Sequence, residues 1–211
     1  MEVLFLNSRN SAQCAARAAD VLRAGGVVLY PTDTLYGLGA DAFSGVAVEK
    51  LYAIKAREKG KVMHCVVADL AAAARYAVPD ERAEQLARKL LPGPLTLILK
   101  KKPNVVTGIG KDIDTLGIRI PNNDFCLALA RSFGAPYTTT SANISGAPTA
   151  RRISEILSQL GPTAGHMIDL VIDAGELPES LPSTVVDLSG DEPVILREGA
   201  ISAKDIRTAL A

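Results

Sequence analysis

The chain has 211 residues, of which 48% are hydrophobic, and its 23 lysines and arginines balance its 23 aspartates and glutamates. This length favours one domain with a sizeable core, and zero formal net charge means that no global field draws the protein to nucleic acid or membrane. With 4% aromatic residues and no Trp, base-stacking platforms are disfavoured. Three well-separated cysteines and two histidines argue against a disulfide framework or a zinc site.

No segment has the pattern of a targeting signal or a membrane anchor. Residues 1–7 lack a basic start and a long apolar run, and no later segment reaches about 18 uninterrupted apolar residues. Together with the unpaired cysteines, this pattern predicts a soluble protein of the reducing cytoplasm.

Helical and strand patterns alternate along the chain. The Ala-rich residues 11–24 predict a helix that ends at two glycines, and the apolar residues 27–30 predict a buried strand. Later helices are predicted after the capping residues Ser44, Asp69 and Ser202 and over residues 79–91, 123–133 and 153–160. Further strands are predicted over residues 62–67, 95–99, 116–120, 137–140, 184–188 and 194–196. Interleaved elements without a repeat or linker predict a single α/β domain over residues 1–211.

The longest stretches predicted to be irregular are residues 31–43, 58–61, 100–114 and 141–152, and functional residues are expected there. The first contains Gly37-x-Gly39-x-x-Ala42 between a predicted strand and a predicted helix. Such glycines suit a dinucleotide phosphate, although a Rossmann turn would leave the strand directly into glycine. A plain Gly-rich loop is an equally good interpretation, and a NAD-dependent enzyme stays as an alternative.

Four cations, Lys55, Arg57, Lys59 and Lys61, follow the helix predicted after Ser44. They suit triphosphate binding, but a solvated helix end would carry the same charges. Because they lie beyond the apolar stripe of that helix, replacing Lys55 or Arg57 is expected to leave the fold intact.

Short polar side chains fill residues 138–146, at the end of a predicted strand. They could shape a turn, but ligands of open α/β sheets bind at such strand ends. The chain has no Gly-x-Ser-x-Gly elbow, no Walker loop and no evident pair of catalytic acids. His64 lies in an apolar run, which favours a packed histidine over a base.

Several ordered blocks together resemble the YrdC-type threonylcarbamoyl-adenylate synthases, over nearly the whole chain. The blocks are PTDTLYGLG (31–39), Lys55-x-Arg57, PGPLT (92–96), GIRIP (117–121), Ser141-x-Asn143, STVVD (183–187) and REG (197–199). The resemblance implies a twisted mixed β-sheet flanked by helices, with a concave basic cleft.

The resemblance also implies a nucleotidyltransferase. Such an enzyme converts L-threonine, bicarbonate and ATP into threonylcarbamoyl-AMP and pyrophosphate, for threonylcarbamoyladenosine modification of tRNA. Mg²⁺ is expected to accompany ATP, and the expected partners are the tRNA-modification enzyme that accepts the adenylate and tRNA itself, with no membrane.

Site residues also follow from the resemblance. Lys55 and Arg57 are expected to be catalytic and to bind ATP, together with Lys61, Thr115, Thr139, Asn143 and Arg197. Threonine is expected to bind Thr34, Arg119, Ser141 and Ser183, with the fork of the arginine suiting a carboxylate.

Two positions depart from the family pattern. Val66 stands where some members have a threonine-contacting His, and the pair Asn122 and Asn123 stands where a His is frequent. The main rival interpretation is an RNA-binding module that uses the same basic cleft without catalysis.

Overall fold

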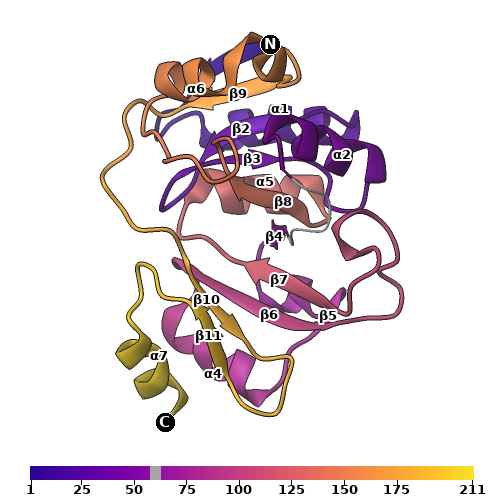
Figure 1. Ribbon diagram of the computed structural model, residues 1–211, viewed down its shortest axis with the longest axis vertical. Coiled ribbons are helices and arrows are strands. Elements are labelled where there is room, and N and C mark those ends of the chain that lie inside the picture. The colour runs from indigo at the N-terminus through magenta and orange to yellow at the C-terminus, as the bar shows by residue number, and fades with distance from the viewer. Residues whose placement is uncertain (58–62) are drawn as a thin grey trace.

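The computed structural model describes residues 1–57 and 63–211 and shows a mixed sheet flanked by helices (Figure 1). The strands are β1 (Glu2–Phe5), β2 (Val28–Pro31), β3 (Tyr36–Gly39), β4 (His64–Val66), β5 (Ala77–Val78), β6 (Leu95–Lys101), β7 (Thr115–Arg119), β8 (Tyr137–Ser141), β9 (Leu170–Asp173), β10 (Thr184–Asp187) and β11 (Val194–Arg197). Their spatial order is β1, β9, β2, β3, β8, β4, β7, β6, β10 and β11, with β5 beside β6. Both parallel and antiparallel pairs occur. The predicted α/β fold with a mixed sheet is confirmed.

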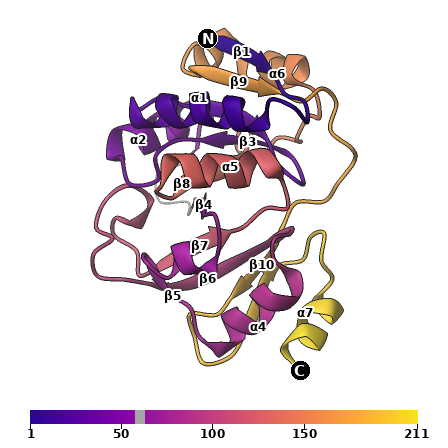
Figure 2. The same cartoon turned by 180° about the vertical axis from the view of Figure 1, so that it is seen from behind.

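Helices cover the sheet. They are α1 (Ser11–Arg23), α2 (Gly45–Ile54), α3 (Leu70–Ala73), α4 (Glu81–Leu90), α5 (Asp124–Phe133), α6 (Ile153–Gly165) and α7 (Ala203–Leu210), with a 3-10 turn, η1, at Gly108–Gly110. Helices α1 and α5 lie side by side over one face, and α4 and α7 pack together near the C-terminus (Figure 2). Within residues 1–57 and 63–211, no helix combines the length and apolar content needed to cross a membrane.

The predicted helix starts are confirmed at the atomic level. The side chains of Ser44, Asp69 and Ser202 each accept a hydrogen bond from a backbone N–H in the first turn of α2, α3 and α7. Asn123 does the same for α5, which ends at Gly134 with a φ of 77°. A short acceptor satisfies an N–H that has no partner within the helix, so these residues define where each helix begins.

The prediction that residues 31–43 are irregular is wrong in its middle part, because Tyr36–Gly39 forms β3. This strand pairs antiparallel with β2, placing Gly37 opposite Tyr30. A Cβ on Gly37 would lie 3.2 Å from the Tyr30 ring, and one on Gly39 would lie 2.8 Å from it. The two glycines therefore make room for a buried tyrosine. They do not form a loop at a helix start, which removes the structural basis for a dinucleotide fingerprint.

Besides β3, three further strands are additional to the prediction: β1 and β9, which pair with each other, and the two-residue β5. Helix α6 also extends beyond the predicted end at Leu160, although Gly161 interrupts it with a φ of 75°. Strands β1 and β9 are short and far apart in sequence, so only their pairing distinguishes them from irregular apolar segments. The predicted irregular segment 58–61 lies outside the described residues.

Two hydrophobic clusters fill the interior. One lies under α1 and α5 and contains Tyr30, Val66 and Tyr137. The other joins α2, α4, α6 and α7 to the sheet. All three cysteines are buried and unpaired.

Candidate active site

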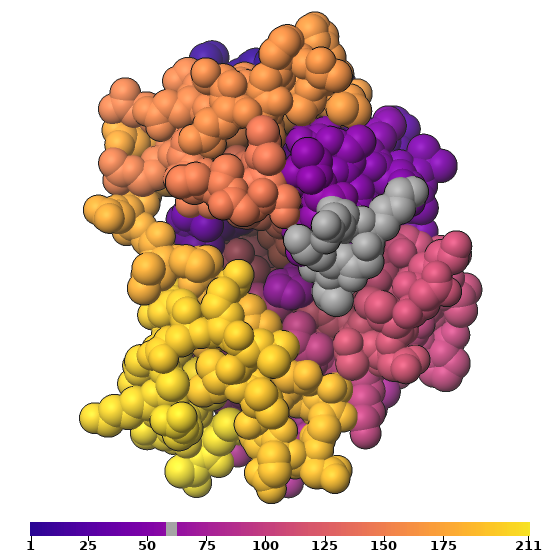
Figure 3. All heavy atoms as spheres, viewed as in Figure 1, coloured from indigo at the N-terminus to yellow at the C-terminus, as the bar shows by residue number. Residues whose placement is uncertain are grey.

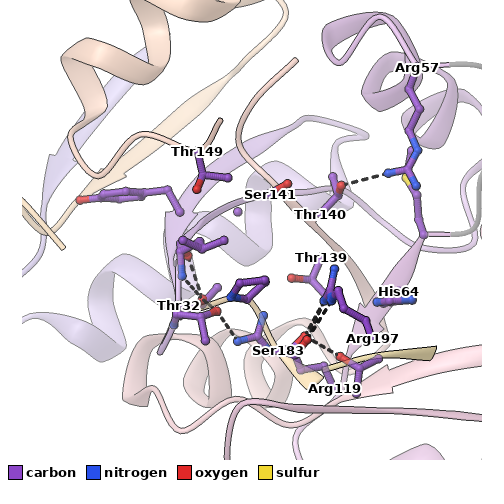
Figure 4. A pocket seen from close by; sticks show the side chains of 17 residues that line it. Thr32, Arg57, His64, Arg119, Thr139, Thr140, Ser141, Thr149, Ser183 and Arg197 are labelled. Atoms are coloured by element: carbon purple, nitrogen blue, oxygen red, sulfur yellow. Dashed lines mark hydrogen bonds between the residues drawn. The ribbon is translucent and has the colours of Figure 1, made fainter. Parts of the chain in front are cut away.

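A polar cavity opens where the ends of several strands meet. It encloses about 300 Å³, and Figure 3 shows the surface hollowed between the orange segment above and the yellow C-terminal segment below. Arginines and hydroxyl side chains dominate its wall (Figure 4). Among the described residues, no Asp, Glu or Cys lines it. The wall therefore suits an anionic ligand that also carries hydrogen-bonding groups.

Strand register brings the lining residues together from distant parts of the chain. Thr139 of β8 lies opposite His64 of β4, which lies opposite Gly117 of β7. On the other side of β8, Ser141 lies opposite Gly37 of β3. The end of β8 thus forms the middle of the cavity wall, as expected for the polar segment after this strand.

Strands β6, β7 and β10 supply the other side. Thr96 lies opposite Arg119 and beside Val185, and its hydroxyl lies 3.0 Å from the hydroxyl of Ser183. Arg197 of β11 lies opposite Val185. Residues almost ninety positions apart are therefore neighbours because β10 adds to the sheet next to β6.

Two of the three cavity arginines contact neutral oxygens. The Arg57 guanidinium donates to the Thr140 hydroxyl over 3.4 Å. Nε and Nη2 of Arg197 donate to the Ser183 carbonyl over 3.0 and 2.8 Å, and Nη2 also donates to the Ser183 hydroxyl. Burial, followed by the charge of Arg119, lowers the pKa of Arg197. These contacts hold the guanidinium groups in the wall.

The third arginine, Arg119, is buried at the end of β7 and is ion-paired. Its Nη2 donates to Asp33 Oδ1 over 2.5 Å and to the Thr34 hydroxyl over 2.7 Å. The Thr34 hydroxyl lies 3.1 Å from that of Thr32, which donates to the Leu35 carbonyl. The turn between β2 and β3 thus surrounds one nitrogen of the guanidinium.

Lys55 lies behind the cavity wall. Only 2% of it is exposed, and its ammonium donates to the Ser141 carbonyl, the Asn143 carbonyl and the Asn143 side chain. The Ser141 hydroxyl donates to the same side-chain oxygen over 2.6 Å. Burial, followed by the charge of Arg57, lowers the pKa of Lys55 to about 8. The expectation that Lys55 lies beyond the buried part of the helix is wrong, because its side chain is buried against the loop that contains Ser141 and Asn143.

His64 lies in the cavity wall, packed against the backbone of β7. A Cβ on Gly117 would lie 2.3 Å from its ring, so a glycine is required there. Burial, followed by the charges of Arg197, Arg119 and Arg57, lowers the pKa of His64 to about 4. The imidazole is therefore neutral at physiological pH. Val66, two residues on, is fully buried in the core under α1 and α5.

The structure brings most of the predicted site residues to this cavity. Those that line it are Thr34, Arg57, Arg119, Thr139, Ser141, Ser183 and Arg197. Lys55 and Asn143 lie behind it and contact Ser141. Thr115 lines a separate depression with Lys100 and Asp114, and Lys61 lies outside the described residues.

Several lining residues were not predicted: Thr32, His64, Thr96, Thr140 and Thr149. Thr32 and Thr96 lie inside the PTDTLYGLG and PGPLT blocks, so the blocks themselves signalled these positions. Thr149 and Thr140 belong to or adjoin the segment 141–152, whose direction only the tertiary structure shows.

The wall offers cations and neutral hydrogen-bonding groups. Within the described ranges, no group of three or more His, Cys, Asp or Glu side chains could hold a metal ion. The arrangement is suited to binding and orienting an anionic substrate and to stabilising negative charge that develops on it.

Comparisons with known proteins agree with this architecture. A protein from Methanocaldococcus jannaschii is 40% identical over 84% of this chain and 81% of its own length. The threonylcarbamoyl-AMP synthase of Bacillus subtilis is 35% identical over 92% of this chain, which spans only 56% of that relative.

A solved structure gives the same result in three dimensions. Pyrococcus abyssi Sua5, crystallised in complex with L-threonine, matches 99% of this chain with a TM-score of 0.89 and 32% identity, and the match covers 61% of that protein. The Sua5/YciO/YrdC profile, described as "Telomere recombination", matches residues 20–199. On both sequence and structure, the chain belongs to the Sua5/YciO/YrdC family.

Proposed function

We propose that this protein is an L-threonylcarbamoyladenylate synthase. It would form threonylcarbamoyl-AMP and pyrophosphate from L-threonine, bicarbonate and ATP. The observation that carries the proposal is that Arg57, Arg119 and Arg197 line the same cavity among hydroxyl side chains. The names of the B. subtilis relative and of the threonine-bound P. abyssi structure support it.

The cavity has chemically distinct contacts for the two larger substrates. Arg57 and Arg197 both line the cavity, and Arg197 donates to the neutral carbonyl oxygen of Ser183, so their guanidinium groups suit the phosphates of ATP. Arg119, with Thr34 and Ser183 nearby, suits a carboxylate and a hydroxyl and is assigned to threonine. Ser141 joins this threonine set and Thr139 the nucleotide set. Mg²⁺ is expected to arrive with ATP.

The reaction needs positioning and charge neutralisation, and it needs no protein nucleophile. The threonine amine attacks bicarbonate, which loses water and gives a carbamate. A carbamate oxygen then attacks the α-phosphorus of ATP, and pyrophosphate leaves with the electrons of the broken P–O bond. Fixed guanidinium groups stabilise the charge that spreads over the phosphate oxygens.

Lys55 and Asn143 would contribute by shaping the loop that presents Ser141, since the ammonium contacts Ser141 and Asn143. Lys61 and Thr115 are assigned to the nucleotide only by family resemblance. A cytoplasmic location, an enzyme that accepts the adenylate, and tRNA are proposed as its setting and partners. The RNA-binding alternative has no observation in its favour.

The test is pyrophosphate release from ATP by the purified chain, with threonine and bicarbonate omitted in turn. We expect release only when all three substrates are present. Release without threonine, or none with all three, would refute the proposed activity. An RNA binder would instead show salt-dependent RNA affinity that threonine does not change.

A further inference from the structure

Asp33 forms a buried ion pair behind the cavity wall. Its side chain is 9% exposed and that of Arg119 is 8% exposed. Asp33 Oδ1 accepts from Arg119 Nη2, and Asp33 Oδ2 accepts the backbone N–H of Asn122 over 3.1 Å. Asp33 is not one of the lining residues. It therefore links the turn after β2 to the segment after β7 and can reach a ligand only through Arg119.

The ion pair fixes the plane of the Arg119 guanidinium. Nη2 carries two hydrogens, and its acceptors are Asp33 and the Thr34 hydroxyl. A planar group held at one nitrogen by two acceptors has little freedom to rotate. The directions of its remaining donors are therefore fixed.

One of those donors is buried without an acceptor. Nε of Arg119 has no hydrogen-bond partner in the described part of the chain, although the residue lines the cavity. A buried N–H without an acceptor is unfavourable, and a ligand oxygen would relieve this. The unpartnered donor points to an anionic ligand group at Arg119.

The surroundings of Arg119 differ from those of Arg197. The charge of Arg119 is partly compensated by Asp33, whereas Arg197, within residues 1–57 and 63–211, donates only to the neutral oxygens of Ser183. A compensated cation suits a single carboxylate, and an uncompensated one suits a polyphosphate. Asp33 thus distinguishes the amino-acid end of the cavity from the nucleotide end.

We propose that Asp33 is a positioning residue for amino-acid recognition: it orients the Arg119 guanidinium so that an N–H group not used by Asp33 or Thr34 meets the carboxylate of the substrate. This inference rests on the proposed function. It assigns Asp33 a role in binding threonine without any contact to it.

The test compares Asp33→Asn with Asp41→Asn. The control removes the same charge from a residue whose carboxylate accepts a local N–H, that of Phe43, over 2.9 Å. For Asp33→Asn we expect the threonine KM to rise roughly 10- to 100-fold because the guanidinium is misplaced, with the ATP KM within about twofold. The control should change neither.

A second readout uses L-threoninamide, which lacks the carboxylate, as a competitive inhibitor. The wild-type enzyme should prefer threonine strongly, and Asp33→Asn should lose most of this preference while inhibition by the amide stays unchanged. A purely structural role for Asp33 would weaken threonine and the amide equally, and that result would overturn the proposal.

If Asp33→Asn does not fold, Asp33→Glu carries the test, because it keeps the ion pair but displaces the guanidinium by one methylene. It should raise the threonine KM and leave the ATP KM unchanged. An active wild-type enzyme whose threonine KM is indifferent to both substitutions refutes only this inference. Failure of the wild type to release pyrophosphate with threonine refutes the proposed function itself.

Discussion

The cavity wall and the layer behind it both contain charged residues, but these residues have different surroundings. In the wall, Arg57 and Arg197 face the cavity and contact hydroxyl and carbonyl groups. Behind it, Lys55 and Asp33 contact only the protein, and each holds a lining residue in place.

The difference shows that residue type does not distinguish a ligand contact from a supporting residue. Lys55 and Arg57 are two positions apart in a run of cations, yet one side chain is buried under a loop and the other lines the cavity. Changes in the wall should therefore affect substrate contacts directly, and changes behind it should act through the lining residue that is held there or through stability.

The largest expected effect concerns the wall and the substrate hydroxyl. Thr34, Ser141 and Ser183 can pair with a threonine hydroxyl, whereas valine would leave these groups unpaired. Discrimination of this kind reaches ~10⁴-fold in kcat/KM. Serine keeps the hydroxyl and loses only a methyl, which costs about 1–3 kcal/mol. Pyrophosphate release with the three amino acids checks this order, and valine ahead of serine would contradict a hydroxyl-reading wall.

The next effect concerns the supporting layer. Lys55→Met should lower the free energy of unfolding by about 3 kcal/mol, because it removes three hydrogen bonds donated by a buried ammonium and takes the donor from the Asn143 carbonyl. Urea denaturation measures this. Lys50→Met is the control, since the Lys50 ammonium donates to the Gly25 carbonyl from a less buried position. Equal losses for the two variants would place Lys55 outside the supporting layer.

Arg57→Ala should separate catalysis from stability. The loss of a charge-assisted contact to phosphate costs about 1.5–3 kcal/mol, or roughly ten- to hundredfold in adenylate formation. The free energy of unfolding should change by less than about 0.5 kcal/mol. Arg88→Ala, on an exposed part of α4, should alter neither quantity. Full activity of Arg57→Ala would show that the arginine does not act on phosphate.

The smallest expected effect is a pH dependence of the free energy of unfolding that arises from His64 in the cavity wall. The pKa of His64 is lowered to about 4 in the folded protein, so only the unfolded chain takes up this proton between about pH 6.5 and 4. The free energy of unfolding should therefore fall as the pH drops through this range, by about 1 kcal/mol at pH 5.5.

The variant His64→Gln should lack this part of the pH dependence in parallel urea titrations. Identical pH profiles for the two proteins would mean that His64 titrates normally. Pyrophosphate should reduce the dependence, because its negative charge offsets the three arginines and raises the pKa of His64.

Local patterns were enough to predict most helices, their capping residues and the central strands. Capping by Ser44 or Asn123 depends on neighbours within one turn, and apolar runs such as β6 are buried wherever they lie. The family blocks likewise identified most of the cavity wall, because most of the residues that line it belong to these short segments of the chain.

The features that could not be predicted depend on residues that are distant in the sequence. Strand β3 was not predicted, because the need for its two glycines arises from the Tyr30 ring that packs against them. Strand β1 is a strand because it pairs with β9. The positions of Lys55 behind the wall, Thr115 at another depression and Asp33 against Arg119 depend on which strands and loops lie next to each other. Charge, hydroxyl content and short-range spacing are properties of the linear chain, but the partner of a buried charge is determined only when the sheet is assembled.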